Sequence, residues 1–296
     1  MKKSVLNPKP VPQPGGANQP ATLDNGLEDL EVSLLLEAID KRYGYDFTNY
    51  APASLRRRLN HFLTLTGCGA ISELIPGLLR DPEFFRTLIS VLSVPVTEMF
   101  RDPFVYQAIR RDVLPFLRTY PHLKIWHAGC ATGEEAYSMA ILLHEEGLAG
   151  RCLIYATDFD ERSLAKAREG IFPLARIKEY TENYNKSGAR GSLSEYYHAG
   201  YDSIILRQEL RDSIVFANHN LATDSVFGEM QFILCRNVLI YFGRTLQDRV
   251  LTLFMNSLCP GGFLCLGTKE SPRFSTVEEK LKIIDGKAKI YQRRME

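Results

Sequence analysis

Two adjacent glutamates follow a glycine turn near the middle of the chain. An apolar run over residues 125–128 ends at Gly129, and apolar residues resume at helical spacing after Gly133. This pattern predicts a strand, a turn and a helix, with the turn at the edge of a parallel sheet where ligands bind. The glycine spacing matches neither the GxGxxG of dinucleotide-binding folds nor the Lys-Ser/Thr ending of a phosphate loop.

The two glutamates indicate the charge of the ligand. Glu134 and Glu135 occupy the first turn of the predicted helix. Carboxylates there suit the helix dipole but would repel a pyrophosphate placed at the same point. The sequence therefore favours a ligand with positive charge, such as S-adenosylmethionine, which carries an ammonium and a sulfonium group.

A second apolar run, residues 152–158, ends in Asp158, which lies 29 positions after Gly129. A carboxylate at the end of the second strand of a nucleotide-binding unit accepts hydrogen bonds from ribose hydroxyls. The alternative is that Asp158 caps a helix that begins near Glu161. We expect the ribose role and keep the helix cap as the other interpretation.

Polar residues also follow the later predicted strands. Asn220 closes a third strand (213–221), and Arg236 and Asn237 follow a fourth (231–235). A fifth strand (261–267) and an antiparallel pair (281–284 and 288–292) complete the predicted sheet. The carboxyl ends of parallel strands meet at one edge, so these polar residues should gather there.

Composition excludes several classes of protein. The 296 residues have a net charge of +1 and are 45% hydrophobic, which indicates a globular chain without a general attraction to nucleic acid. The six cysteines form no CxxC pair and no zinc-type spacing, and no leader sequence or membrane-length apolar run is visible. We expect a cytoplasmic protein with no metal site and no membrane insertion.

The chain divides by pattern into four parts. Residues 1–26 are rich in proline and predict a disordered tail, and residues 27–92 predict a small helical bundle. Residues 93–103 form a linker, and residues 104–296 an α/β domain with an insertion over about 171–208. Thr97 and Arg101 in the linker could reach a ligand carboxylate, although Arg101 could equally form a surface salt bridge.

Three consecutive arginines, Arg56, Arg57 and Arg58, lie among apolar residues of the predicted helix over 53–65. Charge runs of this kind are usually a solvated helix face. The other interpretation is a docking surface for an acidic helix.

Five segments taken together resemble the CheR family, the chemoreceptor glutamate O-methyltransferases of bacterial chemotaxis. They are residues 97–102, 129–138 and 156–158, Asn220-Leu221, and residues 235–242, and the resemblance covers the chain from about Leu27 onward. It implies a Rossmann-like class I methyltransferase domain with a small inserted antiparallel β subdomain and an N-terminal helical domain. The implied cofactor-site residues are Thr97, Arg101, Gly129, Glu134, Glu135, Asp158, Asn220, Leu221, Arg236 and Asn237.

The resemblance also implies an activity and its partners. The methyl group of S-adenosylmethionine would pass to receptor glutamates, leaving S-adenosylhomocysteine, and Glu135 is favoured over Glu134 as the cofactor contact. Arg56 to Arg58 would dock acidic receptor helices, and the insertion binds a receptor C-terminal peptide in some family members. Family members often have Asn at the position of Pro95, so the resemblance implies one polar contact fewer for this chain. We expect the protein to act as a monomer.

A carboxylate acceptor would need no general base, because it is ionised at neutral pH. Arg101 would then orient the acceptor carboxylate and Tyr241 would align its oxygen, the alternative for Tyr241 being a core aromatic. Two other functions stay open: methylation of another protein or small molecule, and binding of S-adenosylmethionine without turnover.

Overall fold

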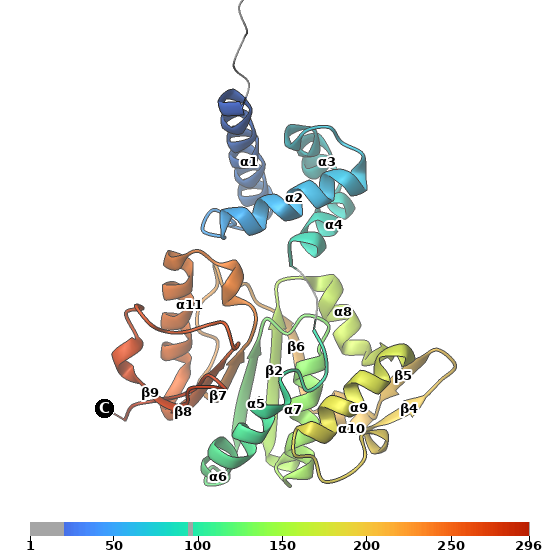
Figure 1. Ribbon diagram of the computed structural model, residues 1–296, viewed down its shortest axis with the longest axis vertical. Coiled ribbons are helices and arrows are strands. Elements are labelled where there is room, and N and C mark those ends of the chain that lie inside the picture. Colours follow the sequence, from blue (N-terminus) through green and yellow to red (C-terminus); the bar gives the residue numbers. More distant parts are fainter. Residues whose placement is uncertain (1–20, 94–96, 296) are drawn as a thin grey trace, which may run out of the picture.

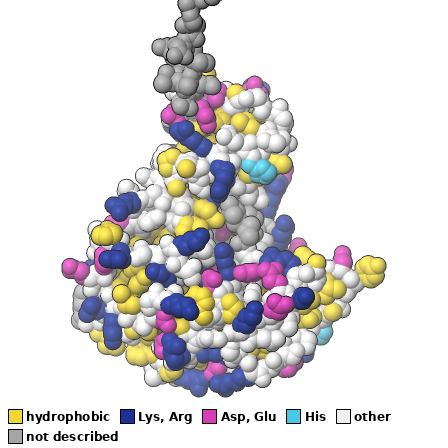
Figure 2. Space-filling model, in the orientation of Figure 1, with side chains coloured by type: hydrophobic (Ala, Val, Ile, Leu, Met, Phe, Trp, Pro, Cys, Tyr) yellow, Lys and Arg dark blue, Asp and Glu magenta, His cyan; other side chains and the backbone are white. Residues whose placement is uncertain are grey.

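The computed structural model describes residues 21–93 and 97–295. The expectations for residues 1–20 and for Pro95 therefore lie outside the described residues. A helical part (α1–α4) stands as a narrower lobe on a broad α/β part, as Figures 1 and 2 show. The predicted combination of a helical N-terminal domain and a Rossmann-like domain is confirmed.

The helical part consists of α1 (Ala21–Tyr43), α2 (Pro52–Thr66), η1 (Ile71–Glu73), α3 (Leu74–Arg80) and α4 (Pro82–Ser93). Its helices match the expected positions except at the start. Helix α1 begins at Ala21, so the assignment of residues 21–26 to a disordered tail is wrong. Gly26 favours a boundary at that point, but one glycine weakens a helix by only about 1 kcal/mol and does not end it.

The α/β part is built on a seven-stranded sheet with the order β6-β2-β1-β7-β8-β10-β9. The first five of these strands run parallel, and β10 pairs antiparallel with both β8 and β9. The strands are β1 (Leu123–Ala128), β2 (Cys152–Asp158), β6 (Ile214–Asn218), β7 (Met230–Cys235), β8 (Leu258–Leu266), β9 (Leu281–Asp285) and β10 (Ile290–Arg293). All predicted strands are present, although β6 ends at Asn218 and leaves Asn220 in the loop that follows.

The central strands are buried on both faces, and their alternating side chains enter two different cores. Ile125 and Phe232 belong to the core on the side of α7 (Glu134–Glu145) and the insertion. Trp126 and Ile233 belong to the core formed by α11 (Arg244–Ser257) and the helical part. This period of two is what a parallel sheet covered on both faces requires.

Shorter elements connect these layers and complete the fold. They are α5 (Pro103–Ala108), the π-helical turn η2 (Ile109–Val113), α6 (Leu114–Leu117), η3 (Ala149–Arg151), α8 (Glu161–Glu169), α10 (Gln208–Asp212), η6 (Leu239–Tyr241) and η7 (Glu278–Lys280).

The insertion forms a small three-stranded antiparallel sheet with the order β3-β5-β4, as expected. Its elements are β3 (Ile171–Pro173), η4 (Leu174–Arg176), α9 (Ile177–Lys186), η5 (Leu193–Tyr196), β4 (Tyr197–Ala199) and β5 (Ser203–Leu206). Helix α9 lies against the segment that leads into α5 (Figure 1).

No single helix among the described residues is long and apolar enough to cross a bilayer. Helix α2 and the helical segment Ile71–Arg80 reach the length and apolar composition of a membrane span only when taken together, and the pair is bent by 63°.

Candidate functional site

A cavity of about 340 Å³ lies between the carboxyl ends of the parallel strands and the helical part. The structure brings most of the predicted site residues together in its wall: Thr97, Arg101, Gly129, Glu135, Asp158, Asn220, Leu221, Arg236, Asn237 and Tyr241. Glu134, Arg56 and Arg57 are not in this wall. The volume falls within the range of small-molecule sites.

The turn after β1 needs glycine at its first position. Gly129 has φ +76°, and a Cβ atom there would overlap Val238 Cγ2. The backbone N–H groups of Gly129 and Cys130 donate to the Thr157 carbonyl at 2.8 and 2.9 Å. These bonds fix the turn against β2 and leave an open backbone surface facing the cavity.

Asp158 holds the other side of this turn. Its Oδ2 accepts a hydrogen bond from the Ala131 N–H at 2.8 Å, and its Oδ1 accepts one from the Asp160 N–H at 3.0 Å. Burial raises the pKa of Asp158 to about 6. The cap of α8 is Asp160, whose side chain accepts from the Arg162 N–H, so the interpretation of Asp158 as the helix cap is wrong.

The two glutamates of α7 have different environments. Glu135 lines the cavity and forms a buried ion pair with Arg236. Glu134 points away from the cavity: it accepts from the Thr132 hydroxyl at 2.6 Å and from the Tyr180 hydroxyl at 3.5 Å. Burial raises the pKa of Glu134. Of the two glutamates, only Glu135 lines the cavity, and its contact with the cofactor stays a prediction.

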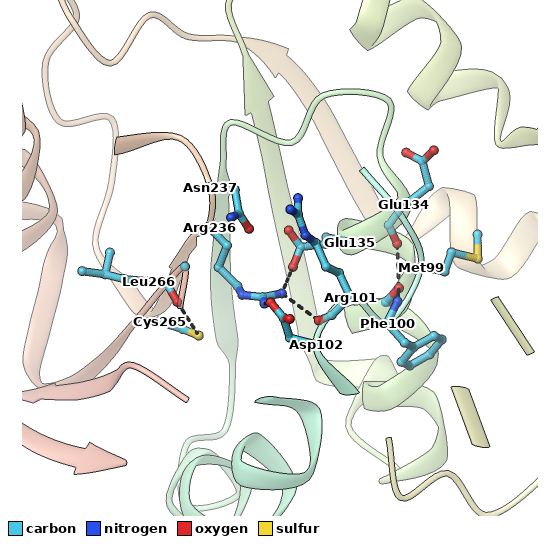
Figure 3. A network of polar contacts seen from close by, with 12 residues as sticks. Met99, Phe100, Arg101, Asp102, Glu134, Glu135, Arg236, Asn237, Cys265 and Leu266 are labelled. Carbon is cyan, nitrogen blue, oxygen red and sulfur yellow. Dashed lines mark hydrogen bonds and ion pairs between the residues drawn. The ribbon is translucent and has the colours of Figure 1, made fainter. Parts of the chain in front are cut away.

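Arg236 ties the cavity wall to the linker (Figure 3). Besides Glu135, its guanidinium contacts the Asp102 carboxylate at 2.6 Å and donates to the Arg101 carbonyl at 3.1 Å. Burial by itself would lower the pKa of Arg236. The negative charges around it, Glu135 first, raise the pKa by more than burial lowers it, so the net shift is upward. Arg236 therefore neutralises the carboxylate of Glu135 and fixes the backbone that carries Arg101.

The linker segment Thr97–Asp102 is strained. Phe100 and Asp102 have φ values of +52° and +55°, a left-handed conformation that costs a non-glycine residue about 1–3 kcal/mol. Such strain persists only where surrounding contacts determine the backbone. Thr97 is buried and Arg101 half-buried, and both side chains line the cavity.

The three arginines of α2 do not share a face, since consecutive helical residues point about 100° apart. Arg58 is buried in the cavity wall, and its guanidinium lies 4.2 Å from the ring centroid of Tyr241. Arg56 pairs with Asp29, and Arg57 is exposed. Arg58 thus lies apart from Arg56 and Arg57, and the docking of acidic receptor helices by this basic helix stays a prediction. Tyr241 is half-buried: it lines the cavity and also packs against the core beneath it.

The remaining predicted residues lie in two loops beside the cavity. Asn220 organises its own loop, since its side-chain oxygen accepts from the Ala222 N–H at 3.0 Å, and Leu221 is buried. Asn237 has φ +61°, and its N–H donates to the Glu270 carboxylate at 3.1 Å. Among the described residues, the side-chain oxygen of Asn237 has no hydrogen-bond partner.

Sequence reasoning missed several cavity residues, including Tyr50, Phe159 and His219. Phe159 and His219 are chain neighbours of the predicted Asp158 and Asn220, and that adjacency could have indicated them. Tyr50 comes from the helical part, and no local motif indicates it. His219 is buried with its edge against Trp126, and its Nε2 lies 3.1 Å from the Ser225 carbonyl.

The cavity fits S-adenosylmethionine on three observations. The backbone of Gly129 lines it without a side chain, the Asp158 carboxylate lies in its wall, and the Asn237 side-chain oxygen has no partner among the described residues. Asp158 would hold the ribose hydroxyls, and Glu135 and Arg101 would lie near the charged amino-acid end. The described residues contain no group of three His, Cys, Asp or Glu side chains that could hold a metal ion.

The fold and this cavity define a class I S-adenosylmethionine-dependent methyltransferase. The family model described as the CheR methyltransferase SAM-binding domain matches residues 95–290, and the model of the CheR all-alpha domain matches residues 30–93. The chain therefore belongs to the CheR methyltransferase family, and its cofactor is S-adenosylmethionine.

The chain is similar to several named methyltransferases. It is 50% identical over 265 residues to the putative methyltransferase Cher3 of Pseudomonas putida, covering 90% of this chain and 97% of that protein. It is 32% identical to a chemotaxis protein methyltransferase of Salmonella typhimurium, over 83% and 85% of the two chains. The N-methyltransferase NodS of Bradyrhizobium japonicum, solved with S-adenosylhomocysteine, is 15% identical with a TM-score of 0.39, over 82% and 98% of the chains.

Proposed function

We propose that the protein transfers the methyl group of S-adenosylmethionine to the side-chain carboxylate of receptor glutamates in chemotaxis signalling. Membership of the CheR family supports this proposal, as do relatives named chemotaxis protein methyltransferases. The bound cofactor supplies an electrophilic methyl group. The tasks left to the protein are to orient the acceptor oxygen and to keep water away from it.

The observation that carries the proposal is the position and hydrogen bonding of the Arg58 guanidinium. Its side chain is in the cavity wall, where Nη1 donates to the Leu92 carbonyl. Nε and Nη2 have no hydrogen-bond partner among the described residues. These two N–H groups are buried and form one edge of the guanidinium; once acceptor binding uncovers this edge, it has the geometry that binds a carboxylate with two parallel hydrogen bonds. Burial lowers the pKa of Arg58, and a carboxylate partner would offset that cost.

Two neighbouring side chains would complete the acceptor position. Tyr241 lies under the Arg58 guanidinium and would direct its hydroxyl toward the acceptor oxygen. Arg101 enters the cavity from the linker and would bind a carboxylate of the cofactor or of the acceptor. A carboxylate acceptor is ionised without help, so no general base is required.

Transfer of label from methyl-labelled cofactor to a receptor cytoplasmic fragment tests the proposal. We expect label that mild alkali releases as methanol, because methyl esters are base-labile. Label that survives alkali, or no transfer to any receptor fragment, would contradict methylation of receptor glutamates.

Substitution of Arg58 tests its role within this reaction. Arg58→Ala should lower kcat/KM for the receptor fragment about tenfold to a hundredfold, the value of hydrogen bonds to a charged group. The affinity for S-adenosylhomocysteine should change less than about twofold, because Arg58 faces the acceptor. Arg58→Lys keeps the charge but cannot form two parallel hydrogen bonds to a carboxylate, so it should be nearly as defective. Arg80→Ala, at an exposed residue, serves as the control. Unchanged turnover in both Arg58 variants would remove Arg58 from the acceptor site.

A further inference from the structure

Contacts from other parts of the chain hold the cofactor-binding linker in its strained conformation. The segment Thr97–Asp102 contains no glycine, yet Phe100 and Asp102 are left-handed. Its conformation therefore depends on contacts made by the rest of the molecule. On the cavity side these are the Arg236 bonds and the hydrogen bond from the Phe100 N–H to the Ser138 hydroxyl at 2.9 Å.

On the opposite side, the contacts come from the insertion. Arg176 Nη1 donates to the Thr97 carbonyl at 3.2 Å, and Asn183 Nδ2 donates to the Met99 carbonyl at 3.2 Å. Both donors are side chains, and both acceptors belong to the stretch of backbone that leads to Arg101. Neither Arg176 nor Asn183 lines the cavity.

Arg176 is itself held in place. Its guanidinium lies 5.1 Å from the ring centroid of Tyr180 and pairs with Glu179 at 3.1 Å and with Glu98 at 4.0 Å. The Tyr180 hydroxyl donates to Glu134, at the start of the helix that carries Glu135. Helix α9 thus contacts both the linker and the first turn of α7, the two elements that provide the charged end of the cofactor site.

We propose that Arg176 and Asn183 are positioning residues, through which the inserted subdomain sets the geometry of the cofactor-binding linker. Any change of the insertion that shifts α9 then alters cofactor affinity, although the insertion contributes no side chain to the cavity wall. The proposal concerns cofactor binding and holds for whatever acceptor the enzyme uses.

Calorimetric titration of the protein with S-adenosylhomocysteine tests this proposal. Arg176→Met and Asn183→Leu each remove one hydrogen bond to the linker, and each should raise the Kd about fivefold. Arg176→Lys keeps a donor and should recover part of the affinity. Lys178→Met and Asn185→Leu change exposed residues of the same helix and should leave the Kd unchanged.

Thermal unfolding of the same variants separates positioning from a general loss of structure. The midpoints of Arg176→Met and Asn183→Leu should stay within a few degrees of the control variants, as the loss of one hydrogen bond requires. An unchanged Kd in both variants would overturn the proposal. A raised Kd in the exposed controls, or no recovery in Arg176→Lys, would overturn it as well.

Discussion

At the scale of single residues, Asp158 shows how burial shapes the site. Its carboxylate is fixed by two backbone N–H groups, yet burial raises its pKa to about 6. The folded state thus binds a proton more readily than the unfolded chain, whose carboxyl titrates near 3.8. By linkage, the contribution of Asp158 to the stability of the cofactor-free protein becomes more favourable as the pH falls from about 7 toward 4. The size of this gain is of order 3 kcal/mol.

Cofactor binding should have the opposite pH dependence. The carboxylate form of Asp158 accepts ribose hydrogen bonds, so the Kd for S-adenosylhomocysteine should be constant above about pH 7 and rise about tenfold per pH unit below about pH 6. Calorimetry across this range checks the prediction. Asp158→Asn should bind more weakly at about pH 8 and show a flat profile, because the amide does not titrate. A wild-type profile in this variant would exclude Asp158 as the titrating group.

The sequence was most informative about which residues lie at the sheet edge that forms the cavity. Asp158, Glu135 and Arg236 follow predicted strands or begin a predicted helix, so local pattern alone places them at one edge of the sheet. The cavity position of Arg58 was not predictable in the same way, because sequence does not show which side of α2 meets the sheet. The helical spacing does indicate that three consecutive arginines cannot share one face, and that signal was available.

At the scale of elements, the turn after β1 joins the sheet to the cofactor site. Gly129 combines a positive φ with close contact to Val238, so both backbone and side-chain space require glycine.

Gly129→Ala should therefore lose about 2–4 kcal/mol of unfolding free energy, from the left-handed backbone and from overpacking. Binding of S-adenosylhomocysteine should become undetectable. Gly147→Ala provides the control, because Gly147 has φ +70° but no atom lies within 4 Å of the position that a Cβ would take, so only the backbone cost applies. Denaturant unfolding and calorimetry measure both effects. Equal stability losses in the two variants would show that contact with Val238 is unimportant.

The insertion illustrates what sequence could not provide at this scale. Its length predicted a separate subdomain, because long connections in α/β domains form their own structure, whereas its antiparallel strands were expected only from the family resemblance. The hydrogen bonds from Arg176 and Asn183 to the linker join residues 79 and 84 positions apart. No local pattern encodes such a pairing, since each side chain is an ordinary polar residue of a short helical segment.

At the scale of the whole molecule, the helical part and the α/β part share one core. Tyr50 forms a β-bridge with Phe242, and their rings contact edge to face at 4.9 Å. Buried residues of α1, α2 and α4 are continuous with those of α11 and one face of the sheet. We therefore expect one cooperative unfolding transition for the wild-type protein.

Tyr50→Ala should weaken this connection. Loss of a buried aromatic costs about 3–5 kcal/mol, and here that loss falls between the two parts. Differential scanning calorimetry should resolve two transitions, and S-adenosylhomocysteine should move them closer together because the cavity has walls from both parts. Tyr201→Ala, at a fully exposed hairpin residue, should leave a single transition. A single, unshifted transition in Tyr50→Ala would show that the connection does not depend on Tyr50.

Strand β1 sends alternate side chains into two separate cores, one shared with the helical part and the other with the insertion. Ile125 and Trp126 are chain neighbours, yet their side chains pack in cores on opposite faces of the sheet. A substitution that disturbs either core therefore disturbs the packing of the same six-residue strand, and that strand runs directly into the turn at Gly129.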